Sequence, residues 1–428
     1  MFKTVFEFFV KASLCLIVFL ASSLNLASSV LAQSGCPTSI KDCKTTQEML
    51  SLAITAGMSS GLEGTVGPVT ATTAKRVACL LPIASALNNN WKVVWGPELI
   101  LKQKSGSGIC GALFPPAKQP VPANTMFVAK KNNENTYAIS VAGTNPASGY
   151  DWCVEDANIT PQAWPFGLHG GFVNEGTNLG VSYLRNLQQL RAPRTLVNFL
   201  AQVGSIPQAS TVYVTGHSLG GALAPTLALW LKNHRSTWDP FNRVTLKVFA
   251  FAGATPGDKV FAAYINGQFT GDSLNVINNT NDVVPHAWSI TTLKQLPNIF
   301  DTVNVNPGFI TLGAITAAET NNMDTIRAFK KTHPNYPFAY GRTGTISQRQ
   351  PITGNLITPP NWPYANCPSL TTIAADAKAK GLGKADTDYV LETAYQHLCA
   401  YPNQLSLQSL RTKENNCINA NPLTYDRK

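Results

Sequence analysis

The sequence is poor in charged residues. Asp, Glu, Lys and Arg make up 13% of its 428 residues, about half of the roughly 25% that is usual in soluble domains. The formal net charge is +10, but the basic residues are scattered and never form a run of five. This scatter argues against nucleic-acid binding and leaves a weak preference for anionic surfaces. Hydrophobic residues make up 44% of the chain, so it also lacks the low hydrophobicity of disordered proteins.

The sequence also lacks the usual spacings of metal-binding residues. It has neither a C-x-x-C pair nor an H-E-x-x-H segment, which excludes common structural-zinc and zinc-protease sites. Nine cysteines are present, and one of them, Cys15, lies in the N-terminal segment described next. The remaining eight are an even number, which favours disulfides in an exported protein. About 105 pairings of eight cysteines are possible, and the sequence does not choose among them.

The first 32 residues have the organisation of a secretory signal peptide. Lys3 and Lys11 precede the apolar stretch Leu14–Ala21, and Val30–Ala32 ends in the small residue that signal peptidases prefer. We therefore expect cleavage before Gln33 and a secreted, extracellular or periplasmic protein.

This N-terminal segment has two other possible interpretations, a membrane anchor and a lipoprotein. A membrane anchor is disfavoured because Ser22, Ser23 and Asn25 interrupt the apolar run, well short of the roughly 18 to 20 residues needed to span a bilayer. A lipoprotein attached at Cys36 is disfavoured because the preceding residues lack the expected leucine. After signal cleavage we expect no transmembrane segment.

From Thr136 onward, short apolar runs ending near Gly or Asn alternate with helical patterns. The runs predict strands at Tyr137–Val141, Thr211–Thr215, Leu246–Phe251 and Leu274–Asn278. The helical patterns cover Gly176–Leu190, Thr195–Val203, Gly221–Lys232 and Lys259–Tyr264. This alternation predicts an α/β fold with a mostly parallel central sheet, helices on both faces and functional residues at the carboxyl ends of the strands.

The organisation along the mature chain follows from the same patterns. We expect residues 33–428 to form one domain, in which residues 33–120 are an N-terminal extension of structural character. Residues around 298–383 are rich in Pro, Asn, Thr and Gly, which predicts an inserted region of long loops. A last helical pattern covers Thr387–Tyr401.

The segment Gly216–Gly220 has the G-x-S-x-G form of a nucleophile elbow. Its small residues permit the sharp strand-to-helix turn that exposes a serine hydroxyl, here that of Ser218. The pattern alone could be a plain turn, but a predicted strand precedes it and a helical pattern follows it directly. The context therefore favours a nucleophilic serine.

A nucleophilic serine needs a histidine base and a carboxylate that orients it. Asp282 is the best carboxylate because it follows a predicted strand, whereas Asp258 is expected to cap a helix and Asp272 precedes the strand. Four of the six histidines are poor candidates for the base. His217 is expected to be a packing residue, His169 precedes the serine, His234 ends the elbow helix and His286 lies too near Asp282. His333 and His397 remain.

Six ordered stretches resemble the class 3 lipase family of α/β-hydrolases, typified by fungal triacylglycerol lipases. They lie within roughly residues 125 to 290: Val141–Thr144, Asp151–Trp152 with Asp156, Leu168–Phe172, Gly216–Ala224, Phe251–Asp258 and Asn278–Pro285. The segment Ala394–His397, followed by Tyr401, resembles the family's histidine segment and favours His397 over His333.

The resemblance implies ester hydrolysis by a Ser218–His397–Asp282 triad, with an oxyanion hole at Thr144 and Leu219 and with no metal or organic cofactor. Its substrate would be a lipid or another ester at an interface. It also implies a lid at Asn145–Phe166, although the aromatic residues there could equally be core. Phospholipids, feruloyl esters or polyesters are alternative substrates on the same scaffold, and a non-catalytic lipid-binding protein is a further, disfavoured alternative.

Overall fold

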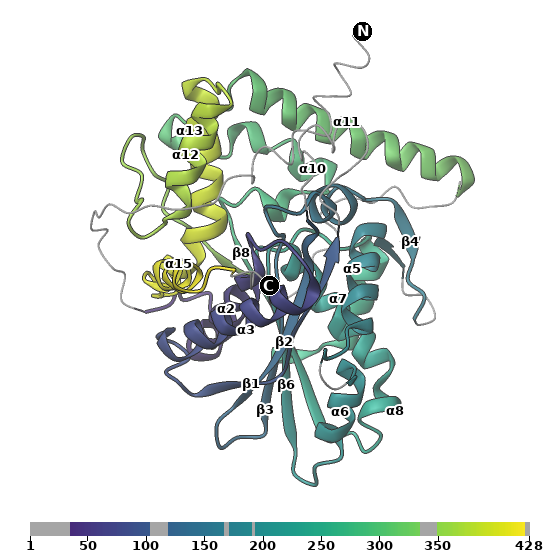
Figure 1. Cartoon of the computed structure of the whole chain (residues 1–428). Coiled ribbons are helices and arrows are strands. Elements are labelled where there is room, and N and C mark those ends of the chain that lie inside the picture. The colour runs from purple at the N-terminus through teal and green to yellow at the C-terminus, as the bar shows by residue number, and fades with distance from the viewer. Residues whose placement is uncertain (1–34, 103–118, 167–170, 191–192, 334–348, 424–428) are drawn as a thin grey trace.

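A seven-stranded sheet forms the centre of the computed structural model (Figure 1). The structure describes residues 35–102, 119–166, 171–190, 193–333 and 349–423; the predicted signal peptide and His169 lie outside these ranges. The sheet order is β1-β2-β3-β6-β7-β8-β9. The strands are β1 (Trp91–Lys102), β2 (Val121–Lys131), β3 (Thr136–Val141), β6 (Ser210–His217), β7 (Val244–Phe251), β8 (Leu274–Asn279) and β9 (Arg349–Ile352).

Within this sheet β3, β6, β7, β8 and β9 run parallel, and β1 and β2 add an antiparallel edge. Strands β6, β7 and β8 are rich in buried apolar residues because helices cover both faces of the sheet. The predicted mostly parallel α/β sheet is therefore confirmed. A two-stranded sheet of β4 (Pro161–Ala163) and β5 (Phe172–Asn174) lies apart from it.

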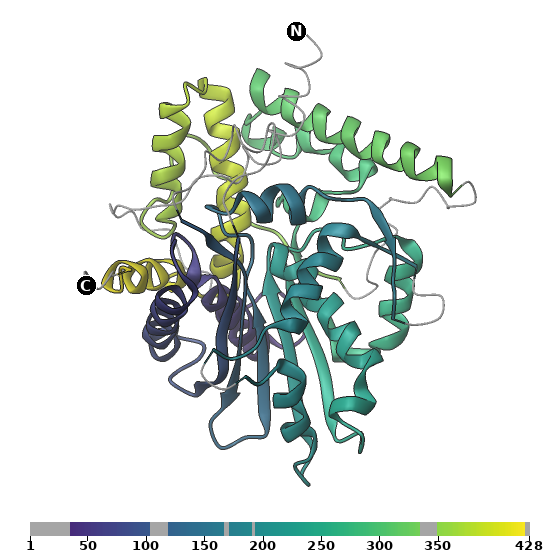
Figure 2. The same cartoon turned by 45° about the vertical axis from the view of Figure 1, so that its right-hand side comes forward.

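Helices pack on the sheet in two layers (Figures 1 and 2). One layer contributes Val181, Phe199, Leu223 and Phe261 to a core with Val212 of β6. Its helices are α5 (Glu175–Asn186), α6 (Leu196–Gly204), α7 (Leu219–Asn233) and α9 (Lys259–Gln268), with the short α8 (Arg235–Trp238) beside α6.

The opposite layer comes from the two ends of the chain. Met49, Leu80 and Leu410 pack in a second core with Phe249 and Phe251 of β7. Its helices are α2 (Cys43–Ala56), α3 (Val66–Ile83), α14 (Ala400–Gln404) and α15 (Leu410–Ala420). The N-terminal extension is therefore part of the folded body of the protein, and it supplies strand β1 as well.

The region around 298–383 differs from the expected long loops. It holds the 24-residue helix α11 (Phe309–Thr332), strand β9 and helix α12 (Ser369–Ala379). Buried Ala314, Ile315, Ala317 and Ala318 form one face of α11. The expectation was wrong here because small residues make a weak apolar stripe that composition alone does not reveal. Helices α11 and α12 lie at one end of the molecule with α10 (Ile290–Leu293) and α13 (Lys384–Ala394), as Figures 1 and 2 show.

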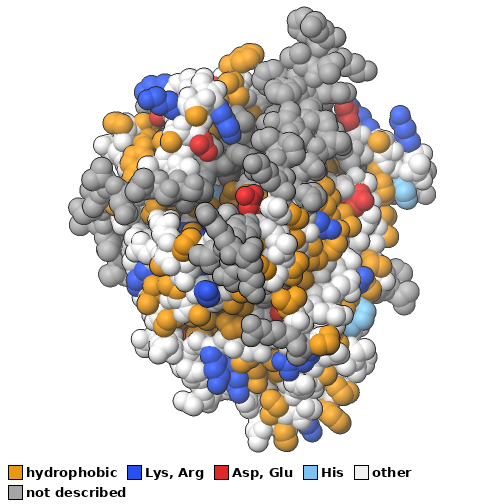
Figure 3. All heavy atoms as spheres, viewed as in Figure 1, with side chains coloured by type: hydrophobic (Ala, Val, Ile, Leu, Met, Phe, Trp, Pro, Cys, Tyr) orange, Lys and Arg blue, Asp and Glu red, His pale blue; other side chains and the backbone are white. Residues whose placement is uncertain are grey.

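Three disulfides join cysteines of the described residues. They link Cys36 to Cys43, Cys79 to Cys417 and Cys367 to Cys399. The bridge from Cys79 to Cys417 spans 338 residues of sequence and fastens α15 to α3. No helix of the described ranges is both long and apolar enough to cross a membrane. Lys and Arg side chains are dispersed over the face seen in Figure 3, where uncharged and hydrophobic atoms dominate.

Candidate active site

Ser218 lies in a sharp turn between β6 and α7. Its backbone has φ +61° and ψ −128°, a strained conformation for a residue with a side chain. Glycine is required on both sides of it. A Cβ on Gly216 would lie 2.2 Å from the carbonyl oxygen of Gly220, and one on Gly220 would lie 2.5 Å from that of Val141. The two glycines therefore let the turn close and present the Ser218 hydroxyl at the sheet edge.

His397 reaches Ser218 from a segment 179 residues further along the chain. It belongs to the π-helical turn Tyr395–Cys399 that follows α13. Its Nε2 lies 2.9 Å from Ser218 Oγ, and its Nδ1 lies 2.9 Å from Asp282 Oδ2. A carboxylate accepts from Nδ1–H, which leaves Nε2 free to accept the serine proton. The imidazole is therefore held in the tautomer that a general base requires.

Asp282 follows β8 and is fully buried. Its Oδ1 accepts from the backbone N–H of Val284 at 3.0 Å, and its Oδ2 accepts from the Tyr401 hydroxyl at 2.9 Å. Both contacts fix the carboxylate plane toward His397. Tyr401 follows the segment that resembles the family's histidine segment, but the sequence alone predicts no function for it.

Asn279, the last residue of β8, ties the strand end to the histidine segment. Its Nδ2 donates to the carbonyl oxygen of Gln396 at 3.0 Å and to Gln396 Oε1 at 2.7 Å, while its Oδ1 accepts from the N–H of Gly354. The backbone next to His397 is therefore anchored to the same strand that positions Asp282. An asparagine at a strand end carries no sequence signal for this connection.

His333, the alternative base, lies elsewhere. It follows α11, is exposed, and stacks on Phe329 with ring centroids 4.1 Å apart. His234 contacts the carbonyl oxygen of Trp230 at the end of α7. Neither side chain contacts Ser218 in the described part of the chain.

His217 does more than pack. Its Nε2 lies 2.9 Å from the carbonyl oxygen of His397, to which it donates. Burial, together with the neighbouring His397 and Arg411, lowers the pKa of His217 well below its ordinary value. A neutral His217 thus adds a second anchor to the His397 backbone.

Thr144 and Leu219 line the same cavity as Ser218. Leu219 is the first residue of α7, so its N–H has no acceptor within the helix and lies at the positive end of the helix dipole. The Thr144 hydroxyl bonds to Asp156 Oδ2 at 2.9 Å. Although part of Asp156 faces the cavity, desolvation raises its pKa well above the ordinary range.

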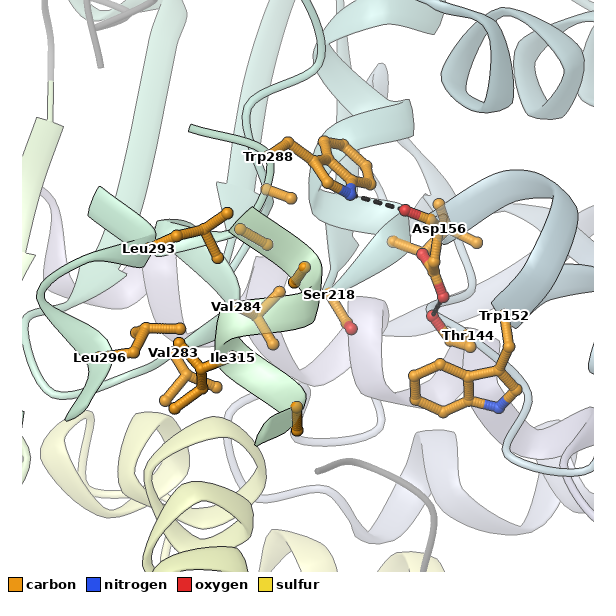
Figure 4. A pocket seen from close by; sticks show the side chains of 15 residues that line it. Thr144, Trp152, Asp156, Ser218, Val283, Val284, Trp288, Leu293, Leu296 and Ile315 are labelled. Atoms are coloured by element: carbon orange, nitrogen blue, oxygen red, sulfur yellow. Dashed lines mark hydrogen bonds between the residues drawn. The ribbon is translucent and has the colours of Figure 1, made fainter. Parts of the chain in front are cut away.

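The cavity beside Ser218 is narrow and apolar, with a volume of about 60 Å³. Figure 4 shows Val283, Val284, Leu293 and Ile315 facing it on one side and Trp152 on the other. Ile315 comes from α11, so this helix lines one side of the cavity, and Trp152 of the expected lid segment Asn145–Phe166 lines the other. In that segment Trp152 and Trp164 are buried, the second in the main core.

A second cavity of about 520 Å³ meets Ser218 from the side of His397. Within the described ranges, no three His, Cys, Asp or Glu side chains are grouped so that they could hold a metal ion.

Comparisons with known proteins find similarity to lipases. Residues 138–292 match the family model described as lipase (class 3). The crystal structure of M37 lipase is 25% identical, with a TM-score of 0.61 over 84% of this chain and 91% of that one. Lipase II from Rhizopus niveus is 18% identical over 59% of this chain and 77% of that one, with a TM-score of 0.38. The Rhizomucor miehei lipase propeptide complex is 20% identical over 62% and 72%, with a TM-score of 0.35.

The matched region contains Thr144, Ser218, Leu219 and Asp282, whereas His397 lies beyond it. The chain resembles the class 3 lipases over residues 138–292 and shares the fold of M37 lipase, and these likenesses identify it as a lipase-like carboxylic ester hydrolase.

Proposed function

We propose that the protein is a secreted lipase or carboxylesterase that cleaves lipid esters through Ser218, His397 and Asp282. The observation that carries the proposal is the continuous chain of hydrogen bonds from Ser218 Oγ through both nitrogens of His397 to buried Asp282. The Ser218 end of this hydrogen-bond chain lines an apolar cavity that suits an acyl chain.

The reaction follows from the positions of these groups. Ser218 Oγ attacks the ester carbonyl carbon while His397 Nε2 takes its proton, and Asp282 stabilises the imidazolium that forms. The carbonyl oxygen becomes an oxyanion that accepts hydrogen bonds from the N–H groups of Leu219 and Thr144. Collapse of this intermediate breaks the bond to the alcohol, whose oxygen receives the proton from His397.

The second half of the reaction repeats these roles with water. His397 removes a proton from water, the hydroxide attacks the acyl carbon, and Ser218 leaves with that proton as the free acid departs. No step needs a metal or an organic cofactor.

The proposal includes export of the chain. The predicted signal peptide ends at Ala32, and residues 33–428 would form the mature single-domain enzyme. Three disulfides among the described residues suit an oxidising compartment.

Hydrolysis of p-nitrophenyl butyrate and palmitate by purified residues 33–428 tests the proposal. We expect turnover by the wild type and a loss of about 10⁴-fold or more with Ser218→Ala. Ser182→Ala on α5 is the matched control and should retain full activity. Absence of serine-dependent turnover of both esters would overturn the proposal.

A further inference from the structure

The second cavity, here called the polar groove, is built differently from the acyl cavity. Its volume is about 520 Å³, against about 60 Å³ for the acyl cavity. The two share Thr144, Trp152 and Ser218, but His397 lines only the polar groove. Polar residues from both ends of the chain also line it: Ser60, Arg76, Ser369, Arg411, Glu414, Asn415 and Asn419.

The position of His397 decides which part of an ester enters each cavity. His397 Nε2 gives its proton to the oxygen of the leaving alcohol, so that oxygen must lie on the side of His397. The alcohol portion then extends into the polar groove, and the acyl chain enters the apolar cavity beyond Thr144 and Leu219.

One face of α15 forms a wall of the polar groove. Arg411, Glu414, Asn415, Ile418 and Asn419 recur at the spacing of one helical face. The bridge between Cys79 and Cys417 holds this helix beside α3, and Figures 1 and 2 show α15 next to α2 and α3. The wall is therefore fixed in place without a ligand.

The charges of the polar groove are already matched within the protein. Arg411 pairs with Glu414 at 2.8 Å and also donates to the carbonyl oxygen of Leu398. Arg76 donates to the carbonyl oxygens of Met58, Ser60 and Asn421. Both cations that line the described groove thus already have partners within the protein, which disfavours a phosphate as the bound group.

The groups that remain available are uncharged. The side chains of Asn415 and Asn419 make no hydrogen bond to another described residue, and neither do the hydroxyls of Ser60 and Ser369. Amides and hydroxyls both donate and accept, as do the hydroxyls of a sugar. We infer that the polar groove binds a neutral, polyhydroxylated alcohol portion, so that the enzyme favours acyl esters of sugars or glycosylated glycerol. This inference rests on the proposed ester hydrolysis.

The test compares lauroyl esters that differ only in their alcohol. Sucrose monolaurate, lauroyl lysophosphatidylcholine and p-nitrophenyl laurate are given to the wild type, Asn415→Leu, Asn419→Leu and the control Asn416→Leu. Asn416 is the exposed neighbour on α15 that does not line the polar groove. Melting temperatures are measured for all four proteins to check that each variant folds. If Asn415→Leu does not fold, Asn419→Leu provides the test alone.

We expect Asn415→Leu or Asn419→Leu to lower kcat/KM for sucrose monolaurate by about threefold to tenfold, the loss expected for one hydrogen bond. Their kcat/KM for p-nitrophenyl laurate should change less than twofold. In Asn416→Leu, kcat/KM for sucrose monolaurate and for p-nitrophenyl laurate should each change less than twofold.

Three results would overturn the inference. The first is that the wild type does not hydrolyse sucrose monolaurate. The second is that the Asn415→Leu and Asn419→Leu variants lose equal activity on sucrose monolaurate and p-nitrophenyl laurate, and the third is that they lose activity on the lysophospholipid alone. If the wild type fails to hydrolyse even p-nitrophenyl laurate, the proposed function itself fails.

Discussion

The hydroxyl of Tyr401 donates to Asp282 Oδ2 at 2.9 Å and accepts from the backbone N–H of Asn279 at the same distance. One buried side chain therefore orients the acid of the proposed triad and satisfies the end of strand β8. Tyr401 belongs to α14, directly after the turn that carries His397. The acid and the base are held by adjoining segments.

Tyr401→Phe removes this hydroxyl and keeps the ring. A buried donor left without its partner costs about 1–3 kcal/mol, so both stability and the orientation of Asp282 should suffer. We expect kcat on p-nitrophenyl butyrate to fall about tenfold, with KM within twofold of the wild type. An unchanged kcat alongside a lowered melting temperature would limit Tyr401 to a structural role.

Thr144→Val tests the oxyanion hole while keeping the side-chain shape. Thr144 Oγ1 donates to Asp156 Oδ2 at 2.9 Å, and the same hydroxyl lines the cavity beside Ser218, where it can turn to donate to the oxyanion. Loss of one such donor costs about 2.7–4 kcal/mol of transition-state stabilisation. We expect kcat to fall about 10²- to 10³-fold in Thr144→Val and to be largely retained in Thr144→Ser. Equal activity of the two variants would assign the oxyanion to backbone donors alone.

Ile315→Trp tests the contribution of α11 to the acyl cavity. Ile315 is 2% exposed and lines the narrow cavity. The indole ring of a tryptophan at this position is larger than the isoleucine side chain and should block part of the cavity. We expect activity on p-nitrophenyl palmitate to fall at least tenfold relative to butyrate. Thr316→Trp changes the adjacent, exposed position and should leave the ratio unaltered. A ratio that does not move in Ile315→Trp would place the acyl chain elsewhere.

Glu392 predicts a pH dependence of stability. Burial raises its pKa to about 7, with hydrogen bonds from Gln396 and Ile357 acting in the opposite direction. A raised carboxyl pKa means that the folded state binds the proton more tightly. The stabilisation is therefore complete below about pH 4.5 and is lost as the pH rises toward 7.

Glu392→Gln removes this titration and keeps the shape of the side chain. We expect the free energy of unfolding, measured in urea, to be higher for the variant than for the wild type. This difference should grow between pH 4 and pH 8, by as much as about 3 kcal/mol. A difference that stays constant over this range would contradict the prediction.

The sequence was most informative where local chemistry dictates local structure. Strands β3, β6, β7 and β8 follow from their apolar runs, and Asp258 caps α9 as predicted, accepting from the N–H of Phe261. The nucleophile elbow follows from its glycines, because no other residue fits the close approach at Gly216.

The remaining features depend on contacts between distant segments. The buried face of α11 is made mostly of Ala, Thr and Ile, whose pattern is weak without the cavity that the helix lines. Asn279 and Tyr401 gain their significance only when β8 and the histidine turn come together. Such polar contacts leave no periodic trace in a single sequence.

The rate of covalent labelling at Ser218 tests the proposed triad most directly. Diethyl p-nitrophenyl phosphate would transfer its phosphoryl group to Ser218 Oγ and release p-nitrophenolate, and peptide mass mapping would locate the adduct. We predict equal rates for the wild type and His333→Ala and a rate about 10²- to 10⁴-fold lower for His397→Ala, the usual contribution of a general base. Labelling at another residue, or a slow His333→Ala with a fast His397→Ala, would contradict the account.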